Sequence, residues 1–254
     1  MINNKKILSV ILARKGSKGA KNKNFRKLLG RPLFQWSVLA SFYSKYVDIT
    51  AVSSNCNDVY KYFIDLRDEL REKYNIKEVD EKLKWIQRPD AISGALSINE
   101  EALIHACTVS NMHFNLDSDV VVTLQPTSPC RLGGLLDLCI EEYDKGEYDS
   151  LITTFPDTPF IWQKIDGKWK FTVDKNGCCN RKMRKEFEES ELTHHDCGNI
   201  YISNKKILLE TKCRIGEKPC IYDVDKLSAL QIDSEEDFEL IENILKTRKL
   251  ETPI

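Results

Sequence analysis

The chain has 254 residues, of which 41% are hydrophobic, and a formal net charge of −1 at pH 7. This length can bury a substantial core as one large domain, with room for a smaller lobe. The near-neutral balance argues against a broadly basic nucleic-acid-binding domain. No apolar stretch approaches the roughly 20 residues that span a bilayer, so we expect no membrane partner.

The cysteine pattern and the first residues of the sequence indicate the cellular compartment of the protein. The nine cysteines are scattered, and the only close pair is Cys178-Cys179. Without a Cys-x-x-Cys spacing, the pattern suggests neither a zinc site nor a disulfide framework. The apolar run after Lys5-Lys6 is short and leads directly into charged residues, unlike a signal peptide. We therefore expect a reduced, cytoplasmic protein.

Predicted strands and helices alternate through the first part of the chain. Strands are expected at residues 7–12, 48–53, 84–87 and 119–124. Helices are expected from Pro32 to Tyr43, with Pro32 at the first helical position and an apolar face at helical spacing, and at 58–74 and 98–109. This alternation predicts an α/β fold with a mostly parallel, doubly wound sheet.

A basic loop with two glycines follows the first strand directly. It runs through residues 13–24 and includes the cations Arg14, Lys15, Lys18, Lys21 and Lys23. Open α/β sheets bind ligands at this edge, and glycines let the backbone approach a ligand closely. The loop lacks both the Walker ending and the three-glycine dinucleotide fingerprint. It is therefore either an unusual polyphosphate site or a solvated basic turn.

A proline-rich loop follows the strand at 119–124. It reads Gln125-Pro126-Thr127-Ser128-Pro129, with Arg131 shortly after. Its neutral side chains suit the recognition of hydroxyl, amide and carboxylate groups. The same residue types also cap helices, so the pattern alone leaves binding and capping both open.

The middle of the chain departs from the alternation. Strands are predicted at 149–155, 160–165 and 168–173, with a hairpin turn at Asp166-Gly167. Within one domain that spans residues 1–254, this predicts a protruding lobe at approximately 156–196. The basic cluster at 181–185 is either a charged face balanced by glutamates or a set of cations for a carboxylate sugar.

Three further patterns favour structural roles over metal binding or catalysis. His194-His195 points to opposite faces of an extended segment, which disfavours a shared metal ion. His105 lies within an apolar helix and is interpreted as structural. Ser234 and Asp237 form a capping box that begins the final helix.

Taken together, the motifs resemble the acylneuraminate cytidylyltransferase family, the CMP-sialic acid synthetases and relatives that act on other nonulosonic acids. The family's Ala-Arg, Ser-Lys-Gly and Lys-Asn signature is matched within residues 13–24, and its Leu-Gln-Pro-Thr-Ser-Pro motif at 124–129. Arg88-Pro89 falls where the family has a CTP-contacting pair. Residues 198–202 match its Asn-Gly-Ala-Ile-Tyr-Ile strand, with Cys197 in place of the asparagine.

The resemblance implies a Rossmann-like fold of the nucleotide-diphospho-sugar transferase type. It implies transfer of CMP from CTP to the anomeric hydroxyl of a nonulosonic acid, with release of pyrophosphate. It also implies a homodimer in which the lobe makes the contact and closes the partner's site. Enzymes for Kdo usually have Gln-Gly-Asp-Glu-Pro at the second loop, so this motif favours nonulosonic acids.

The resemblance also implies roles for individual residues. The CTP-binding group is Arg14, Gly16, Ser17, Lys18, Lys23, Asn24, Arg88 and Ser97. The sugar-binding group is Gln125, Thr127, Ser128, Lys164 and Tyr201. The catalytic group is Arg14, Lys23, Gln125 and Asp233. A magnesium ion is expected at Asp233 and Gln231, where the family has Asp-Ile-Asp, although glutamine supplies only a neutral oxygen.

Three other functions remain open at this point. A Kdo-type cytidylyltransferase shares the chemistry, and a glycosyltransferase that uses nucleotide sugars shares the α/β architecture. Gln231 also motivates a third interpretation, a relative that binds CTP with attenuated or no turnover.

Overall fold

The computed structural model describes residues 2, 4–16, 22–131, 133–171 and 182–248. The strands of the main sheet are β1 (Ile7–Leu12), β4 (Ile49–Ser54), β5 (Leu83–Gln87), β6 (Val120–Leu124), β7 (Ser150–Asp157), β10 (Thr193–Asn204) and β11 (Pro219–Asp223). The α-helices are α1 (Leu33–Phe42), α2 (Asn57–Asp68), α3 (Val79–Lys82), α4 (Asn99–Phe114), α5 (Leu135–Lys145), α6 (Lys205–Thr211) and α7 (Glu235–Arg248). Two small hairpins pair β2 (Lys27–Leu28) with β3 (Arg31–Pro32), and β8 (Trp162–Ile165) with β9 (Lys168–Phe171).

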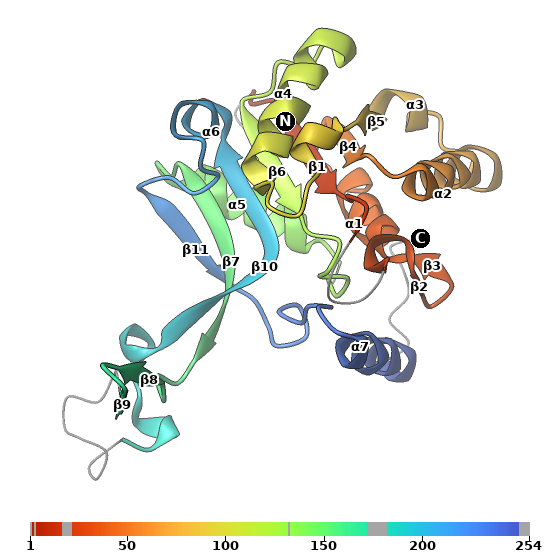
Figure 1. Cartoon of the computed structure of the whole chain (residues 1–254). Helices are drawn as coiled ribbons and strands as arrows, with labels where there is room; N and C mark the ends of the chain where they lie inside the picture. Colours follow the sequence, from red (N-terminus) through yellow and green to blue (C-terminus); the bar gives the residue numbers. More distant parts are fainter. Residues whose placement is uncertain (1, 3, 17–21, 132, 172–181, 249–254) are drawn as a thin grey trace.

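The main sheet has the order β11-β7-β10-β6-β1-β4-β5 (Figure 1). Neighbouring strands are parallel except at β10, which is antiparallel to both β6 and β7. The expected mostly parallel sheet is therefore confirmed.

Helices cover both faces of this sheet. On one face, the core joins Phe34 of α1, Phe63 of α2 and Ile140 of α5. On the other, it joins Leu103 of α4 and Leu208 of α6. Because both faces are covered, β4 and β6 are buried at every position, as their continuous apolar and small residues require. The sheet is doubly wound, as predicted.

Helix α1 differs from its prediction. Nine of its ten residues are buried, including the polar Gln35, Ser37 and Ser41, so it has no solvent face. The helix lies between the sheet and a second apolar cluster in which Trp36 meets Phe238 of α7. Gln35, Ser37 and Ser41 all have hydrogen-bond partners; Gln35 Nε2, for example, donates to the carbonyl of Tyr62 at 2.7 Å. Pro32 belongs to β3 and precedes the helix instead of starting it.

A lobe projects from the sheet where β7 and β10 run beyond it (Figure 1). The β8–β9 hairpin turns at Asp166 and Gly167, both with positive φ, which confirms the predicted hairpin. Its aromatic rings form a small cluster of their own, in which Phe160 and Trp162 both contact Phe171. Arg181 of the basic cluster and the end of the strand predicted at 168–173 lie outside the described residues.

The final helix begins as predicted. The Ser234 amide donates to Asp237 Oδ2 at 2.8 Å, and the Asp237 amide donates to Ser234 Oγ at 3.2 Å. These two bonds complete the capping box. Among the described residues, no helix has the length and apolar character that crossing a membrane demands.

Candidate active site

A cavity of about 260 Å³ opens at the carboxyl ends of β1 and β6. The two strands are parallel, with Ile11 opposite Leu124, so the loops that follow them leave at the same edge of the sheet. The cavity is lined by Leu12, Arg14, Lys23, Asn24, Arg88, Asn99, Thr123, Leu124, Gln125, Pro126 and Thr127. Residues from the basic loop, the Arg88-Pro89 pair and the proline-rich loop thus share one site.

Two arginines make the cavity strongly electropositive. Arg88 is 3% exposed and donates through Nε to Ser53 Oγ at 3.1 Å and through Nη2 to the Ser53 carbonyl at 2.6 Å. Burial, followed by the nearby charge of Arg14, lowers the pKa of Arg88 to about 10. Within the described part of the chain, neither arginine forms an ion pair with a carboxylate. An anionic ligand is therefore the natural partner for these charges.

The basic loop is held at both of its described ends. Asn24 is buried and donates from Nδ2 to the Arg14 carbonyl at 2.9 Å. The Arg14 guanidinium donates to the carbonyls of Ser93 and Gly94. Gly16 has a φ of 82°, a conformation that glycine adopts readily. The candidate CTP ligands Ser17 and Lys18 lie outside the described residues.

Lys23 connects the basic loop to the C-terminal segment. Its Nζ lies 2.9 Å from Asp233 Oδ1 and 3.0 Å from the Ile232 carbonyl. The lysine side chain is 15% exposed, whereas that of Asp233 is 69% exposed. The structure thereby brings the proposed metal ligand next to the proposed triphosphate cation.

The chain offers magnesium a small set of oxygen donors. Asp233 supplies one exposed carboxylate, and the amide nitrogen of Gln231 donates to the Cys197 carbonyl. No group of three or more His, Cys, Asp or Glu side chains that could hold a metal occurs among the described residues. Magnesium is commonly held by one or two carboxylates together with substrate phosphates. The residues therefore fit an ion that takes most of its ligands from a triphosphate.

The proline-rich loop presents amide and hydroxyl groups to the cavity. Gln125 and Thr127 both line it, and Thr127 Oγ1 donates to Gln125 Oε1 at 3.3 Å. Gly198 lies beside them with a φ of 61°; a Cβ there would come within 3.4 Å of Gln125 Nε2 and 2.3 Å of Gln231 Nε2. The glycine therefore leaves room for both glutamine side chains.

Besides Gly16, Gln231 and Asp233, four of the predicted ligands within the described residues do not line this cavity. Ser97 lies in the turn after Gly94, and Asn99, which we did not predict, lines the cavity at the start of α4. Ser128 is fully buried behind the loop. Lys164 is exposed on the projecting β8–β9 hairpin, whose lobe lies apart from the sheet edge (Figure 1).

Tyr201, the fourth of these residues, is engaged elsewhere. Its hydroxyl donates to Asp196, with oxygen–oxygen distances of 2.8 and 3.0 Å, and the guanidinium carbon of Arg214 lies 4.1 Å from the ring centroid. Burial and the Asp196 carboxylate raise the pKa of Tyr201 above its usual value. In this chain Tyr201 therefore supports β10.

The histidines have separate environments. His194 Nδ1 lies 2.9 Å from Asp223 Oδ1, whereas His195 Nε2 lies 3.5 Å from Thr193 Oγ1. His105 is half-buried on α4, where burial and the charge of Arg88 lower its pKa. His105 is not among the residues that line the cavity.

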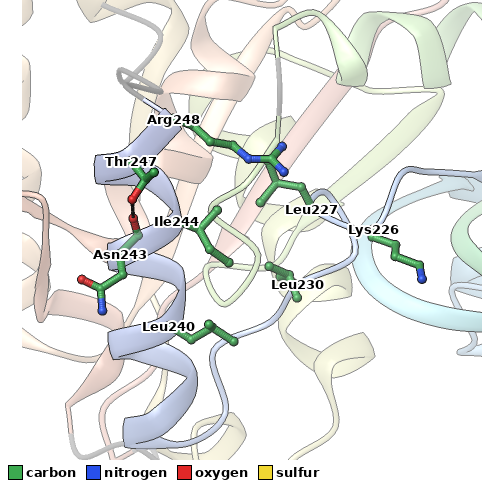
Figure 2. A pocket seen from close by; sticks show the side chains of 8 residues that line it. All are labelled: Lys226, Leu227, Leu230, Leu240, Asn243, Ile244, Thr247 and Arg248. Carbon is green, nitrogen blue, oxygen red and sulfur yellow. Dashed lines mark hydrogen bonds between the residues drawn. The ribbon is translucent and has the colours of Figure 1, made fainter.

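A second cavity, of about 400 Å³, lies between α7 and the segment before it (Figure 2). Leu227, Leu230, Leu240 and Ile244 make it mostly apolar, with Lys226 and Arg248 among its other lining residues. None of the predicted site residues lines it. Its apolar walls do not suit a triphosphate.

Similarity to known proteins agrees with this geometry. A family model described as cytidylyltransferase matches residues 8–63. The chain is 24% identical over 249 residues to a post-translational flagellin modification protein B of Campylobacter coli, covering 96% of this chain and 97% of that protein. It is 25% identical over 247 residues to a CMP-N,N'-diacetyllegionaminic acid synthase of Campylobacter jejuni, covering 96% and 97%. It is 27% identical over 238 residues to an N-acylneuraminate cytidylyltransferase of Escherichia coli, covering 92% of this chain and 51% of that protein, so it spans about half of that relative's length.

Solved structures show the same architecture. A CMP:2-keto-3-deoxy-manno-octonic acid synthetase complexed with CTP superimposes with a TM-score of 0.63 and 11% identity, covering 96% of this chain and 99% of that one. At this identity the likeness establishes a Rossmann-like nucleotidyltransferase fold. With the family match and the relatives above, it leads to one conclusion: the chain is similar to cytidylyltransferases, among them the acylneuraminate cytidylyltransferases that its two loops resemble.

Proposed function

We propose that the protein transfers CMP from CTP to the anomeric hydroxyl of a nonulosonic acid. The observation that carries this proposal is the single cavity in which Arg14, Lys23 and Arg88 face Gln125 and Thr127. The cations suit a triphosphate, and the neutral amide and hydroxyl groups suit a sugar acid. The relatives named for sialic and legionaminic acids support this substrate class.

In the proposed reaction, the anomeric oxygen attacks the α-phosphorus of CTP. A phosphorus–oxygen bond forms to the sugar, the bond to the β-phosphate oxygen breaks, and pyrophosphate leaves with its electron pair. The hydroxyl proton passes to phosphate or solvent. The chain contributes alignment and charge neutralisation, since phosphoryl-type transfers leave little covalent chemistry to the protein.

Individual side chains have distinct tasks in this proposal. Arg14, Arg88 and Lys23 hold the phosphates, with Ser17, Lys18 and Asn24 completing the loop. Gln125 and Thr127 orient the sugar acid. Asp233 and the Gln231 amide oxygen would hold magnesium, which supplies positive charge against the α-phosphate and the leaving group.

Dimerisation belongs to the same proposal. The exposed tryptophans of the lobe, Trp162 at 51% and Trp169 at 67%, support a surface that a second copy covers. Lys164 lies on the same hairpin as these rings. In a dimer it would serve the partner's cavity rather than its own.

The experiment is incubation of the purified protein with CTP, magnesium and one sugar acid from a panel of sialic, legionaminic, pseudaminic and Kdo acids. We expect pyrophosphate release and a CMP-sugar mass with at least one nonulosonic acid, and neither product with UTP in place of CTP. Turnover of Kdo alone would overturn the substrate class. Binding of CTP without any turnover would favour the attenuated relative, for which Gln231 and the Lys23–Asp233 ion pair are the supporting observations.

A further inference from the structure

A buried arginine lies directly behind the sugar-facing loop. Arg131 is 8% exposed and pairs with no carboxylate in the described ranges. Its Nη2 donates to the Gln125 carbonyl at 2.6 Å and to the Asn199 carbonyl at 2.8 Å, and its Nη1 donates to Ser37 Oγ at 2.7 Å. One guanidinium therefore joins the proline-rich loop, β10 and α1.

These bonds form closed rings around the backbone of Gln125. Ser37 Oγ, which accepts from Arg131, itself donates to the Gln125 carbonyl at 3.1 Å. The Gln125 amide donates to the Asn199 carbonyl at 3.4 Å, the same oxygen that Arg131 reaches. Both backbone polar groups of Gln125 are thus fixed by one network, while its side chain lines the cavity.

Burying a full positive charge costs free energy that a neutral hydrogen-bond donor to the same backbone carbonyls would not cost. Burial lowers the pKa of Arg131 to about 9, because a low-dielectric environment disfavours the charged form. A planar guanidinium can nevertheless donate to several oxygens in fixed directions, which a lysine cannot do. The geometry therefore points to precision in the placement of Gln125 as the use of this residue.

We propose that Arg131 is a positioning residue for the sugar acid, acting through Gln125. This inference rests on the proposed function, and it assigns Arg131 no contact with either substrate. Loss of the guanidinium leaves Arg14, Arg88 and Lys23 in place, so CTP binding survives. The side-chain amide of Gln125 loses its fixed direction, so binding of the sugar acid weakens.

The test is Arg131→Lys, which keeps the charge but not the fork of donors. We expect the KM for the sugar acid to rise about tenfold or more, since small misplacements of positioning groups have large effects. The Kd for CTP, measured by calorimetry, should stay within about twofold, since sites without shared partners are nearly independent. Hydrogen exchange of a peptide over residues 120–131 should become faster. Added guanidinium ion should restore part of the acid affinity of Arg131→Ala.

The matched control is Arg31→Met. Arg31, on β3, is also a partly buried arginine. Its Nη1 lies 3.0 Å from Glu69 Oε2, and it does not line the active-site cavity. The control should lower Tm without changing the KM for the acid. If Arg131→Lys does not fold, Ser37→Ala replaces it, because it removes one donor to the Gln125 carbonyl; a KM rise of about threefold is expected.

The outcomes distinguish a failure of the proposed function from a failure of the positioning role of Arg131 alone. A wild-type protein that forms no CMP-sugar with any acid overturns the proposed function. An active wild type whose Arg131→Lys or Ser37→Ala variant keeps its KM for the acid, and loses only stability, overturns the positioning role alone. Equal losses of CTP and acid affinity also overturn it, because the network would then act on the whole site.

Discussion

Among single residues, Arg88 is unusual because burial of its positive charge costs free energy. Its guanidinium is buried, and both of its described hydrogen bonds go to Ser53, a neutral residue. An unpaired buried charge destabilises a fold unless a ligand completes it. This cost agrees with the proposed role of Arg88 in binding CTP.

Arg88→Met should accordingly weaken CTP binding while leaving the fold intact. We expect the Kd for CTP to rise at least about tenfold, consistent with loss of a charge-assisted bond worth roughly 1.5–3 kcal/mol. Tm should stay equal or rise, because the variant removes a buried charge. Calorimetry measures the first effect and thermal unfolding the second.

The control for Arg88 is Lys82→Met. Lys82 is also a partly buried cation with a lowered pKa, and it does not line the cavity. It should leave CTP affinity unchanged. Retention of wild-type CTP affinity by Arg88→Met would remove this residue from the proposed site.

Gln231 allows a second test at the residue scale. Its amide nitrogen donates to the Cys197 carbonyl, so Gln231→Glu replaces a donor with a carboxylate that faces the same oxygen. Without metal, we expect destabilisation of about 1–3 kcal/mol from the unsatisfied and repelled carbonyl. Unfolding curves with and without magnesium measure it, with the exposed Gln163→Glu of the lobe as control. A more stable Gln231→Glu in metal-free buffer would contradict the assigned contact.

At this scale, contiguous motifs predict part of the lining of the cavity. Arg14, Lys23 and Gln125 all line the cavity where their loops predict. Asn99 was missed because the nearby Ser97 seemed to be the family's serine, and only the helix start shows which side chain faces the cavity. The bond from Gln231 to Cys197 joins residues 34 positions apart, and no local pattern encodes such a pairing.

Among the elements, α7 depends on its capping box. Hydrogen bonds from the backbone amides of Asp233 and Ser234 lower the pKa of Asp237. A carboxylate whose pKa is lower in the folded state stabilises the fold above its unfolded pKa. That contribution disappears as the pH falls from about 3.8 through the lowered folded value.

Ser234→Ala should therefore destabilise the protein by about 1 kcal/mol at pH 7. Asp237→Asn should lose part of the acid sensitivity as well, because no carboxylate remains to be protonated. Urea unfolding at pH 7 and at pH 3 measures both effects, with the exposed Ser190→Ala as control. A Ser234→Ala variant with wild-type stability would show that the box contributes nothing.

Element prediction succeeded where one periodicity dominates and failed where packing overrides it. The apolar run of β1 has its predicted bounds, since a strand buried on both faces needs no polar positions. Helix α1 was expected to have one apolar face, yet its polar Gln35, Ser37 and Ser41 are all buried. Gln35 donates to the Tyr62 carbonyl of α2, Ser37 donates to the Gln125 carbonyl, and Ser41 bonds Thr50 of β4. Local spacing contains no information about these contacts between elements.

For the whole molecule, alternation of elements predicts the doubly wound sheet, but not the direction of β10. The chain enters the lobe along β7 and returns along β10, so the returning strand must run against its neighbours. The lobe itself is predicted by its hairpin turn. The proposed dimer contact of the lobe involves a second molecule, which the pattern of elements in one chain does not encode.

Trp169→Ser tests that covering partner. If the lobe forms the proposed dimer, loss of this exposed ring should shift the protein toward monomer in sedimentation experiments and reduce turnover. Tm should change by no more than a few degrees, because the ring lies outside the sheet's core. The control is Met112, an exposed apolar residue that lies on α4, away from the lobe. Met112→Ser should leave the assembly unaffected. A Trp169→Ser variant that sediments like the wild type would exclude this ring from the interface.

Strand β10 connects the lobe with the backbone of Gln125. It is continuous from Thr193, in the lobe, to Asn204, and on the way the Asn199 carbonyl holds the Gln125 amide. A register shift between Asp196 and Tyr201 separates the lobe end from the sheet end. Asn199 lies between these two residues, so the contact that fixes the backbone of Gln125 falls within the stretch where β10 departs from regular pairing with β7. A change in the geometry of this stretch would therefore alter the position of Gln125 directly.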